Sequence, residues 1–193
     1  METKPFIALA CLAGASLLYS CSQPAPQEAA APSTTRVNAM VADWQRAKKF
    51  TQAYLDSADE KTVAYKLSEK TPRSFGAQLL HLAEANYGLV KAGGGNATDM
   101  GFGTLEGKPE FVTKAAVADA VNASYDYVIA SLGTLNDNQL MDTVKVELFP
   151  GMKVAMTKEA FYNKAFEHQT HHRGQATQYL RAQGKTPPQE MLF

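Results

Sequence analysis

Three of the four histidines in this chain have a spacing suited to binding a metal ion. His168 and His172 are one turn apart on a predicted helix, because each residue advances an α-helix by about 100°. Both imidazoles therefore lie on one face, where two ring nitrogens can bind the same ion. His81 lies on another predicted helix and can supply a third ligand. Three ligands leave coordination positions open for water or a substrate, as in catalytic metal sites.

The same spacing also fits a metal-free interpretation, in which both histidines belong to the apolar stripe of their helix. A buried imidazole needs a partner, because an unpaired polar group in the interior costs about 1 to 3 kcal/mol. Tyrosine hydroxyls, Glu84 or backbone carbonyls can serve as that partner. Taken by itself, the spacing favours this metal-free alternative. The predicted stripe consists of Phe161, Ala165, His168, His172, Ala176 and Tyr179.

The residues around the histidine pair are weaker candidates. His171 lies about 100° around the helix from His172, so we leave it out of the ligand set as a supporting or surface group. Glu167 adjoins the first histidine but is turned away by the same angle, so the segment is not a zinc-protease motif. Arg173 and Gln175 could orient an anion or a water molecule, although such residues more often serve packing or the surface.

The first 20 residues resemble the signal peptide of a lipoprotein. A lysine precedes an apolar run that is shorter than the roughly 20 residues needed to span a bilayer as a helix. The run ends in Leu-Tyr-Ser-Cys21, which resembles the bacterial lipobox, whose cysteine is lipidated and becomes the new N-terminus. We therefore expect lipidation of Cys21 and a membrane anchor in the bacterial cell envelope, facing the periplasm. An ordinary secretory signal with an incidental cysteine is the alternative.

A tether and one folded domain follow this leader. Residues 21–36 contain three prolines among small and polar residues, which is typical of a semi-extended spacer. The chain is 45% hydrophobic and 20% charged, which suits a single globular domain over residues 37–193. Both cysteines precede residue 22, so this domain contains neither a disulfide nor a cysteine nucleophile. A formal net charge of zero and the lack of a basic run argue against a nucleic-acid partner.

Apolar residues recur at helical spacing in four long segments, which predicts an all-α four-helix bundle. Thr71-Pro72 suits the start of the second helix, because proline is favoured at the first helical position. Residues 143–157 alternate in polarity around Pro150-Gly151, so a short hairpin is expected between the last two helices. The predicted helices span about residues 37–57, 71–92, 113–132 and 157–183.

Two of these helices resemble segments of the DinB-like superfamily. The segment similar to its second helix is Gln78-Leu-Leu-His-Leu-Ala-Glu-Ala-Asn86, which contains His81. The segment similar to its last helix is His168-Gln-Thr-His-His172-Arg-Gly-Gln, followed by Tyr179-Leu-Arg, Gly184 and Pro187-Pro188. The resemblance covers about residues 37–188 and makes metal binding the favoured interpretation of the histidines.

The resemblance implies up-down-down-up connectivity, frequent homodimerisation and a divalent ion bound by His81, His168 and His172. It also implies a functional range that includes metal-dependent transferases acting with low-molecular-weight thiols. We expect a metal-dependent transferase or hydrolase that acts on a small molecule, with Zn or Ni as the ion. The sequence identifies no catalytic base: Glu84 could reach a neighbouring site, but it fits a solvated helix residue equally well. The alternative is a non-catalytic binding or structural protein of the envelope that the metal ion stabilises.

Overall fold

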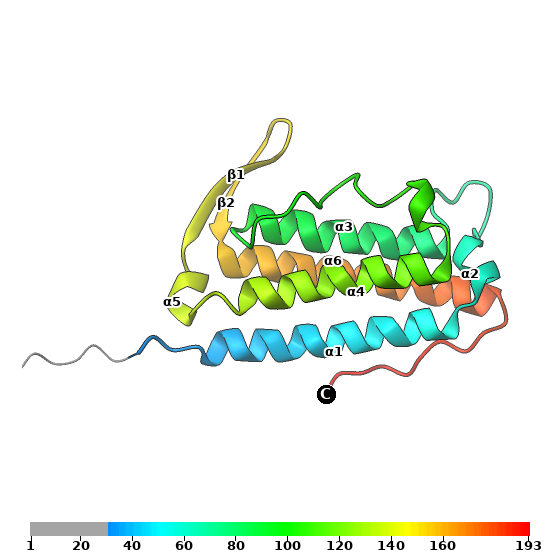
Figure 1. The fold of residues 1–193 in the computed structure, drawn as a ribbon, viewed down its shortest axis with the longest axis horizontal. Helices are drawn as coiled ribbons and strands as arrows, with labels where there is room; N and C mark the ends of the chain where they lie inside the picture. The colour runs from blue at the N-terminus through cyan, green and yellow to red at the C-terminus, as the bar shows by residue number, and fades with distance from the viewer. Residues whose placement is uncertain (1–30) are drawn as a thin grey trace, which may run out of the picture. The chain divides into compact units, whose positions relative to one another are not determined.

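Four long helices form the body of the protein in a computed structural model that describes residues 31–193 (Figure 1). Shorter elements connect them, and the prediction of an all-α bundle is confirmed for this part of the chain. The long helices are α1 (Thr35–Ser57), α3 (Phe75–Ala92), α4 (Lys114–Leu132) and α6 (Lys158–Ala182). The connecting elements are α2 (Glu60–Ala64), the 3-10 turn η1 (Pro109–Phe111), α5 (Asp137–Leu140), β1 (Thr143–Phe149) and β2 (Met152–Thr157).

The bundle has up-down-down-up connectivity, as the resemblance implies. Figure 1 shows α1 and α6 running in one direction along the bundle and α3 and α4 running in the other. The long segment after α3 returns along the bundle through η1, so that α4 begins at the same end as α3. This crossover makes α3 and α4 parallel neighbours and leaves α6 to pack antiparallel to α3.

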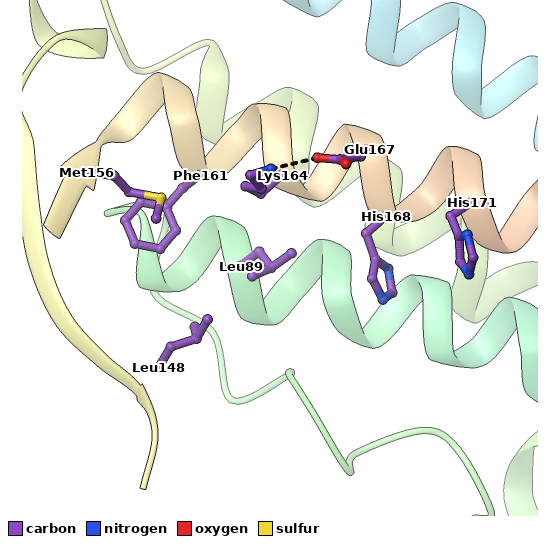
Figure 2. A pocket seen from close by; sticks show the side chains of 8 residues that line it. All are labelled: Leu89, Leu148, Met156, Phe161, Lys164, Glu167, His168 and His171. Atoms are coloured by element: carbon purple, nitrogen blue, oxygen red, sulfur yellow. Dashed lines mark hydrogen bonds and ion pairs between the residues drawn. The ribbon is translucent and has the colours of Figure 1, made fainter. Parts of the chain in front are cut away.

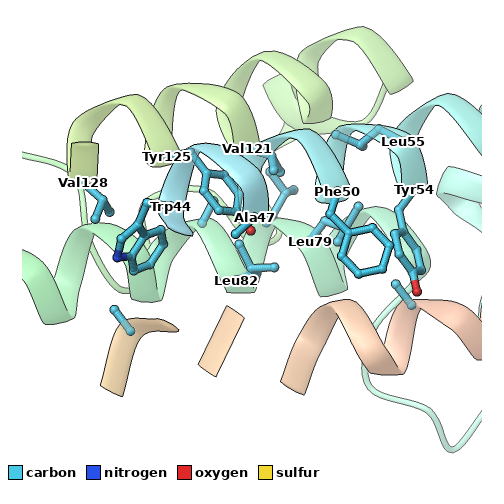
Figure 3. Close-up of a cluster of buried hydrophobic side chains, with 14 of the residues drawn as sticks. Trp44, Ala47, Phe50, Tyr54, Leu55, Leu79, Leu82, Val121, Tyr125 and Val128 are labelled. Carbon is cyan, nitrogen blue, oxygen red and sulfur yellow. The ribbon is translucent and has the colours of Figure 1, made fainter. Parts of the chain in front are cut away.

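Aromatic and aliphatic side chains from all four long helices form one core. Figure 3 shows side chains of α1, α3 and α4 meeting in its centre. The Trp44 ring packs edge-on against Tyr125 and Phe166, with centroid separations of 5.8 and 5.3 Å. Such edge-to-face contacts add to the stabilisation from apolar burial, which makes this cluster a rigid support for the helices.

Two of the predicted helix starts are confirmed. Thr113 and Thr157 are the N-caps of α4 and α6, and each hydroxyl accepts a hydrogen bond from a backbone N–H three residues later at 3.2 Å. The predicted hairpin is confirmed as well. Its strands β1 and β2 pair antiparallel, and Gly151 occupies the turn at a φ of +82°, which other residues rarely adopt.

The predicted start of the second long helix is wrong. It begins at Phe75, where the Ser74 hydroxyl accepts a hydrogen bond from the Ala77 N–H at 3.2 Å. Thr71-Pro72 belongs to a preceding loop, because tertiary contacts hold that loop outside the helix. The Phe75 N–H donates to the Tyr65 carbonyl at 3.0 Å, and the Tyr179 hydroxyl donates to the Arg73 carbonyl at 3.0 Å.

The first helix begins at Thr35, so Thr35 and Arg36 belong to it and not to a tether. The carboxylate of Asp137 in α5 accepts hydrogen bonds from the N–H groups of Arg36 and Val37 at 3.0 and 3.1 Å. This cap comes from about a hundred residues away in the sequence, so a local pattern does not predict it.

The proposed leader, Cys21 and most of the tether lie outside the described residues. Among residues 31–193, every helix is too short or too polar to cross a bilayer.

A buried polar cluster ties α6 to α1 and α4. The Arg173 guanidinium donates to Gln169 Oε1 at 2.6 Å and to the Thr51 hydroxyl at 3.4 Å, and it lies 4.5 Å from the centre of the Phe50 ring. The Tyr125 hydroxyl donates to Gln169 Oε1 at 2.9 Å and lies 2.7 Å from the Thr51 hydroxyl. Burial lowers the pKa of Arg173. The cluster therefore orients α6 through polar contacts on a face about 100° around the helix from the histidines.

We expect Tyr125→Phe to lower the free energy of unfolding by about 1 to 3 kcal/mol, because it removes two buried hydrogen bonds of the cluster. Tyr162→Phe is the matched control. The Tyr162 hydroxyl is buried near Ser131 but makes no hydrogen bond of normal geometry, so its removal should be neutral or slightly stabilising. Urea denaturation of both variants measures the difference, and equal losses would contradict the role of the cluster.

Candidate metal centre

The structure brings His81, His168 and His172 together in the interface between α3 and α6. One nitrogen from each ring lies within 4.8 Å of the others. The ring centroids are 4.3 Å apart for His168 and His172, 4.8 Å for His81 and His172, and 5.3 Å for His81 and His168. The arrangement could bind a metal ion. As the sequence predicts, the i, i+4 spacing places His168 and His172 on one face of their helix.

The separation of the facing nitrogens on α6 suits a shared ion as well as it suits an N–H···N hydrogen bond. Nε2 of His168 and Nε2 of His172 are 3.1 Å apart. Two nitrogens about 2.0 to 2.1 Å from a zinc ion, and roughly 100° apart around it, are also about 3.1 Å from each other. In addition, Nδ1 of His168 is buried and has no hydrogen-bond partner among the described residues. Protein contacts alone therefore leave the polar atoms of this ring incompletely satisfied.

All three imidazoles are held in the neutral form that metal binding requires. The pKa of His168 is lowered to about 4 and that of His172 to about 3, chiefly by burial and in part by the neighbouring histidines. Burial also lowers the pKa of His81, as does the adjacent Arg73 guanidinium. A metal ion would therefore not compete with protons for these nitrogens near neutral pH.

The Nδ1 atom of His81 is held by two charged residues that sequence reasoning did not identify. Glu106 Oε2 lies 3.2 Å from this atom, and Arg73 Nη2 lies 3.1 Å from it. Arg73 Nε also donates to Glu106 Oε1 at 2.8 Å. A carboxylate that accepts a hydrogen bond from one ring nitrogen orients the other nitrogen toward a metal ion. Glu106 is placed to do this for Nε2 of His81.

Gln78 contacts the Nδ1 atom of His172, and a second glutamine links Gln78 to His171. The Gln78 side-chain amide lies 2.8 Å from this nitrogen and also contacts the Gln175 side chain. The Gln175 amide in turn lies 2.8 Å from Nε2 of the exposed His171. Leaving His171 out of the ligand set agrees with this geometry, because its ring nitrogen is used outside the cluster.

Glu84 is not a free base, contrary to its candidate role. It is buried, with an exposed fraction of 3%, and its Oε1 accepts hydrogen bonds from the N–H groups of Leu105 and Glu106, both at 2.8 Å. These bonds hold the returning loop against α3 and so place Glu106 beside His81. Glu84, Glu106 and His81 form a second cluster with metal-ligating groups. Arg173, a candidate for orienting an anion, instead makes its contacts within the buried polar cluster of the core.

A cleft opens beside the histidines toward the β-hairpin (Figure 2). Its volume is about 490 Å³, within the range of small-molecule sites. The hairpin supplies part of its wall, and His168 and His171 point from α6 toward α3 along it. A second cavity of about 470 Å³ lies against His171 and His172. The residues that line the first cleft are Leu89, Leu148, Met156, Phe161, Lys164, Glu167, His168 and His171.

Together the fold and this cluster define a four-helix protein with a candidate three-histidine metal centre. The chain belongs to the DinB family, whose sequence model matches residues 32–191. A DinB-like protein from Bacillus cereus is similar in structure, with a TM-score of 0.64 and 19% identity over 79% of this chain and 96% of that one. The DinB-like protein YjoA of Bacillus subtilis has a TM-score of 0.59 and 21% identity, over 81% and 97%. No curated protein matches this chain significantly in sequence.

We expect the metal-free protein to lose stability as the pH falls below about 6.5. The histidines of the unfolded chain titrate near 6.5, whereas those of the folded chain titrate near 4 and 3 at His168 and His172. Between these values the unfolded state binds more protons, so the free energy of unfolding decreases as the pH falls through the window.

Melting temperatures at pH 7, 6 and 5 in the presence of a chelator measure this dependence. The double variant His168→Gln/His172→Gln should show a shallower decline, because it removes both shifted groups. Parallel curves for the two proteins would contradict the predicted titration.

Proposed function

We propose that this chain is a metal-dependent enzyme of the DinB family that carries out transferase or hydrolase chemistry on a small molecule. The observation that carries the proposal is the convergence of three neutral imidazoles from two packed helices, one of which, His168, lines a cleft. A closed structural site would use four protein ligands, whereas three leave an open coordination position. The cleft is large enough for a substrate to reach that position.

The three proposed ligands are His81, His168 and His172. When bound there, a divalent ion supplies Lewis acidity, which polarises a carbonyl or activates water or a thiol near neutral pH. Zn and Ni, the two ions we propose, are among those that imidazole ligands suit. The chain's own part is to hold the rings: Glu106 is placed to accept a hydrogen bond from Nδ1 of His81, which turns Nε2 of that ring toward the ion.

We expect the purified protein to contain close to one divalent ion per chain. Replacing His81, His168 or His172 by alanine should weaken binding by more than the roughly 10- to 100-fold typical of losing an outer partner. His171→Ala is the matched control, because this residue is adjacent to a ligand yet bonds elsewhere. Elemental analysis and competition with a chelating dye measure both quantities.

Stoichiometric metal in the three ligand variants would overturn the proposed centre. If the variants lose metal, two measurements distinguish a catalytic ion from a structural one. They are the melting temperature with and without chelator, and assays with thiol and ester substrates. Metal-dependent turnover supports an enzyme. A large fall in melting temperature without turnover would instead favour the non-catalytic alternative, in which the ion only ties α3 to α6.

We also propose that Cys21 carries a lipid and anchors the protein in the bacterial cell envelope, facing the periplasm. The support is the sequence of the leader and the tether that follows it. We expect the wild-type protein to partition into detergent-extracted membranes and Cys21→Ser to remain in the aqueous fraction. Equal partitioning of both would contradict lipidation. Homodimerisation stays a prediction of the family resemblance.

A further inference from the structure

We propose that the cleft beside His168 binds the apolar part of the substrate. The substrate class is then a small molecule with a linear alkyl or aryl group, attached to a polar group that reaches the three histidines. This inference rests on the proposed function and deepens it. The geometry that carries it is an apolar chamber with one histidine of the cluster in its wall.

The walls of the cleft come from three parts of the chain. Leu89 projects from α3 and Phe161 from α6, while Leu148 of β1 and Met156 of β2 close the side formed by the hairpin (Figure 2). These side chains offer no hydrogen-bonding oxygen or nitrogen. An occupant that is apolar would gain binding energy by displacing water from them, whereas a polar occupant would lose its hydrogen bonds to water.

The charged residues of the cleft neutralise each other. Lys164 Nζ donates to Glu167 Oε2 at 2.8 Å, and both side chains are mostly exposed to solvent. They therefore lie toward the solvent side of the cleft as an ion pair and leave no single charge to attract an ionic group. His168 is the polar group through which the cleft adjoins the cluster.

The second cavity lies on the side of His172 and has more polar residues along its lining. Its lining includes Arg73, Thr71, Gln78, Gln175, Gln178 and Tyr179, which carry hydrogen-bonding groups. The walls of both cavities expose mainly apolar surface. The apolar group of the substrate is assigned to the first cleft because Leu89, Phe161 and the hairpin residues form its wall beside His168.

A series of unbranched alkyl hydroxamates, from acetohydroxamate to octanohydroxamate, tests the inference. The hydroxamate group binds the metal ion, and the alkyl chain probes the cleft. In the zinc-loaded protein we expect the Kd to fall about 3- to 4-fold for each added methylene, until the cleft is filled. In the metal-free protein, affinity should be lower throughout, but it should still increase with chain length.

Leu89→Gln and Met156→Gln should flatten the dependence on chain length without changing the Kd of acetohydroxamate. The first changes the helix wall and the second the hairpin wall, so a folding defect in one variant does not remove the test. Leu67→Gln, in the lining of the second cavity, is the matched control and should keep the wild-type dependence.

The outcomes separate this inference from the function on which it rests. A protein that binds zinc and acetohydroxamate but shows no dependence on chain length would overturn the apolar cleft and leave the metal centre standing. A dependence that survives both cleft variants would also overturn it. A protein that binds neither zinc nor acetohydroxamate would overturn the proposed function itself.

Discussion

The antiparallel packing of α6 on α3 is the constraint on which the rest of the structure depends. Both metal-ligand candidates on α6 face α3, and the third candidate comes from α3 itself. A rotation of α6 by one residue, or about 100°, would carry His168 and His172 out of the interface. The candidate centre therefore exists only for one rotational setting of this helix.

The buried cluster on a neighbouring face of α6, about 100° around the helix from the histidines, favours that setting. Gln169 and Arg173 each follow one of the histidines, and both are buried against α1 and α4. A guanidinium in an apolar core is costly unless its donors find acceptors, so any rotation that breaks these contacts is disfavoured. The stacking of Arg173 over Phe50 adds a further directional contact. The residues that pack into the core and the residues that form the candidate site are thus adjacent on α6, so core packing also sets the orientation of the site.

Much of the fold could be predicted because its signals are local. The threonines that cap α4 and α6 act through backbone groups three residues away, and the i, i+4 histidines share a face by helix geometry alone. The errors have the opposite origin. Proline at position 72 suits a helix start, but contacts from Tyr65 and Tyr179 hold that segment in a loop. Asp137 caps α1 across about a hundred residues, which no local pattern reveals.

The sequence by itself determined the periodic features of this protein: the four helices, the hairpin, the family resemblance and the three histidines that could share an ion. Only the tertiary structure decided what surrounds those histidines. It placed Glu106 beside His81, committed Glu84 to the loop backbone and Arg173 to the core, and built an apolar cleft from α3, α6 and the hairpin. The physical reason is that helix geometry depends on neighbouring residues, whereas burial, charge pairing and cavities depend on which distant segments pack together.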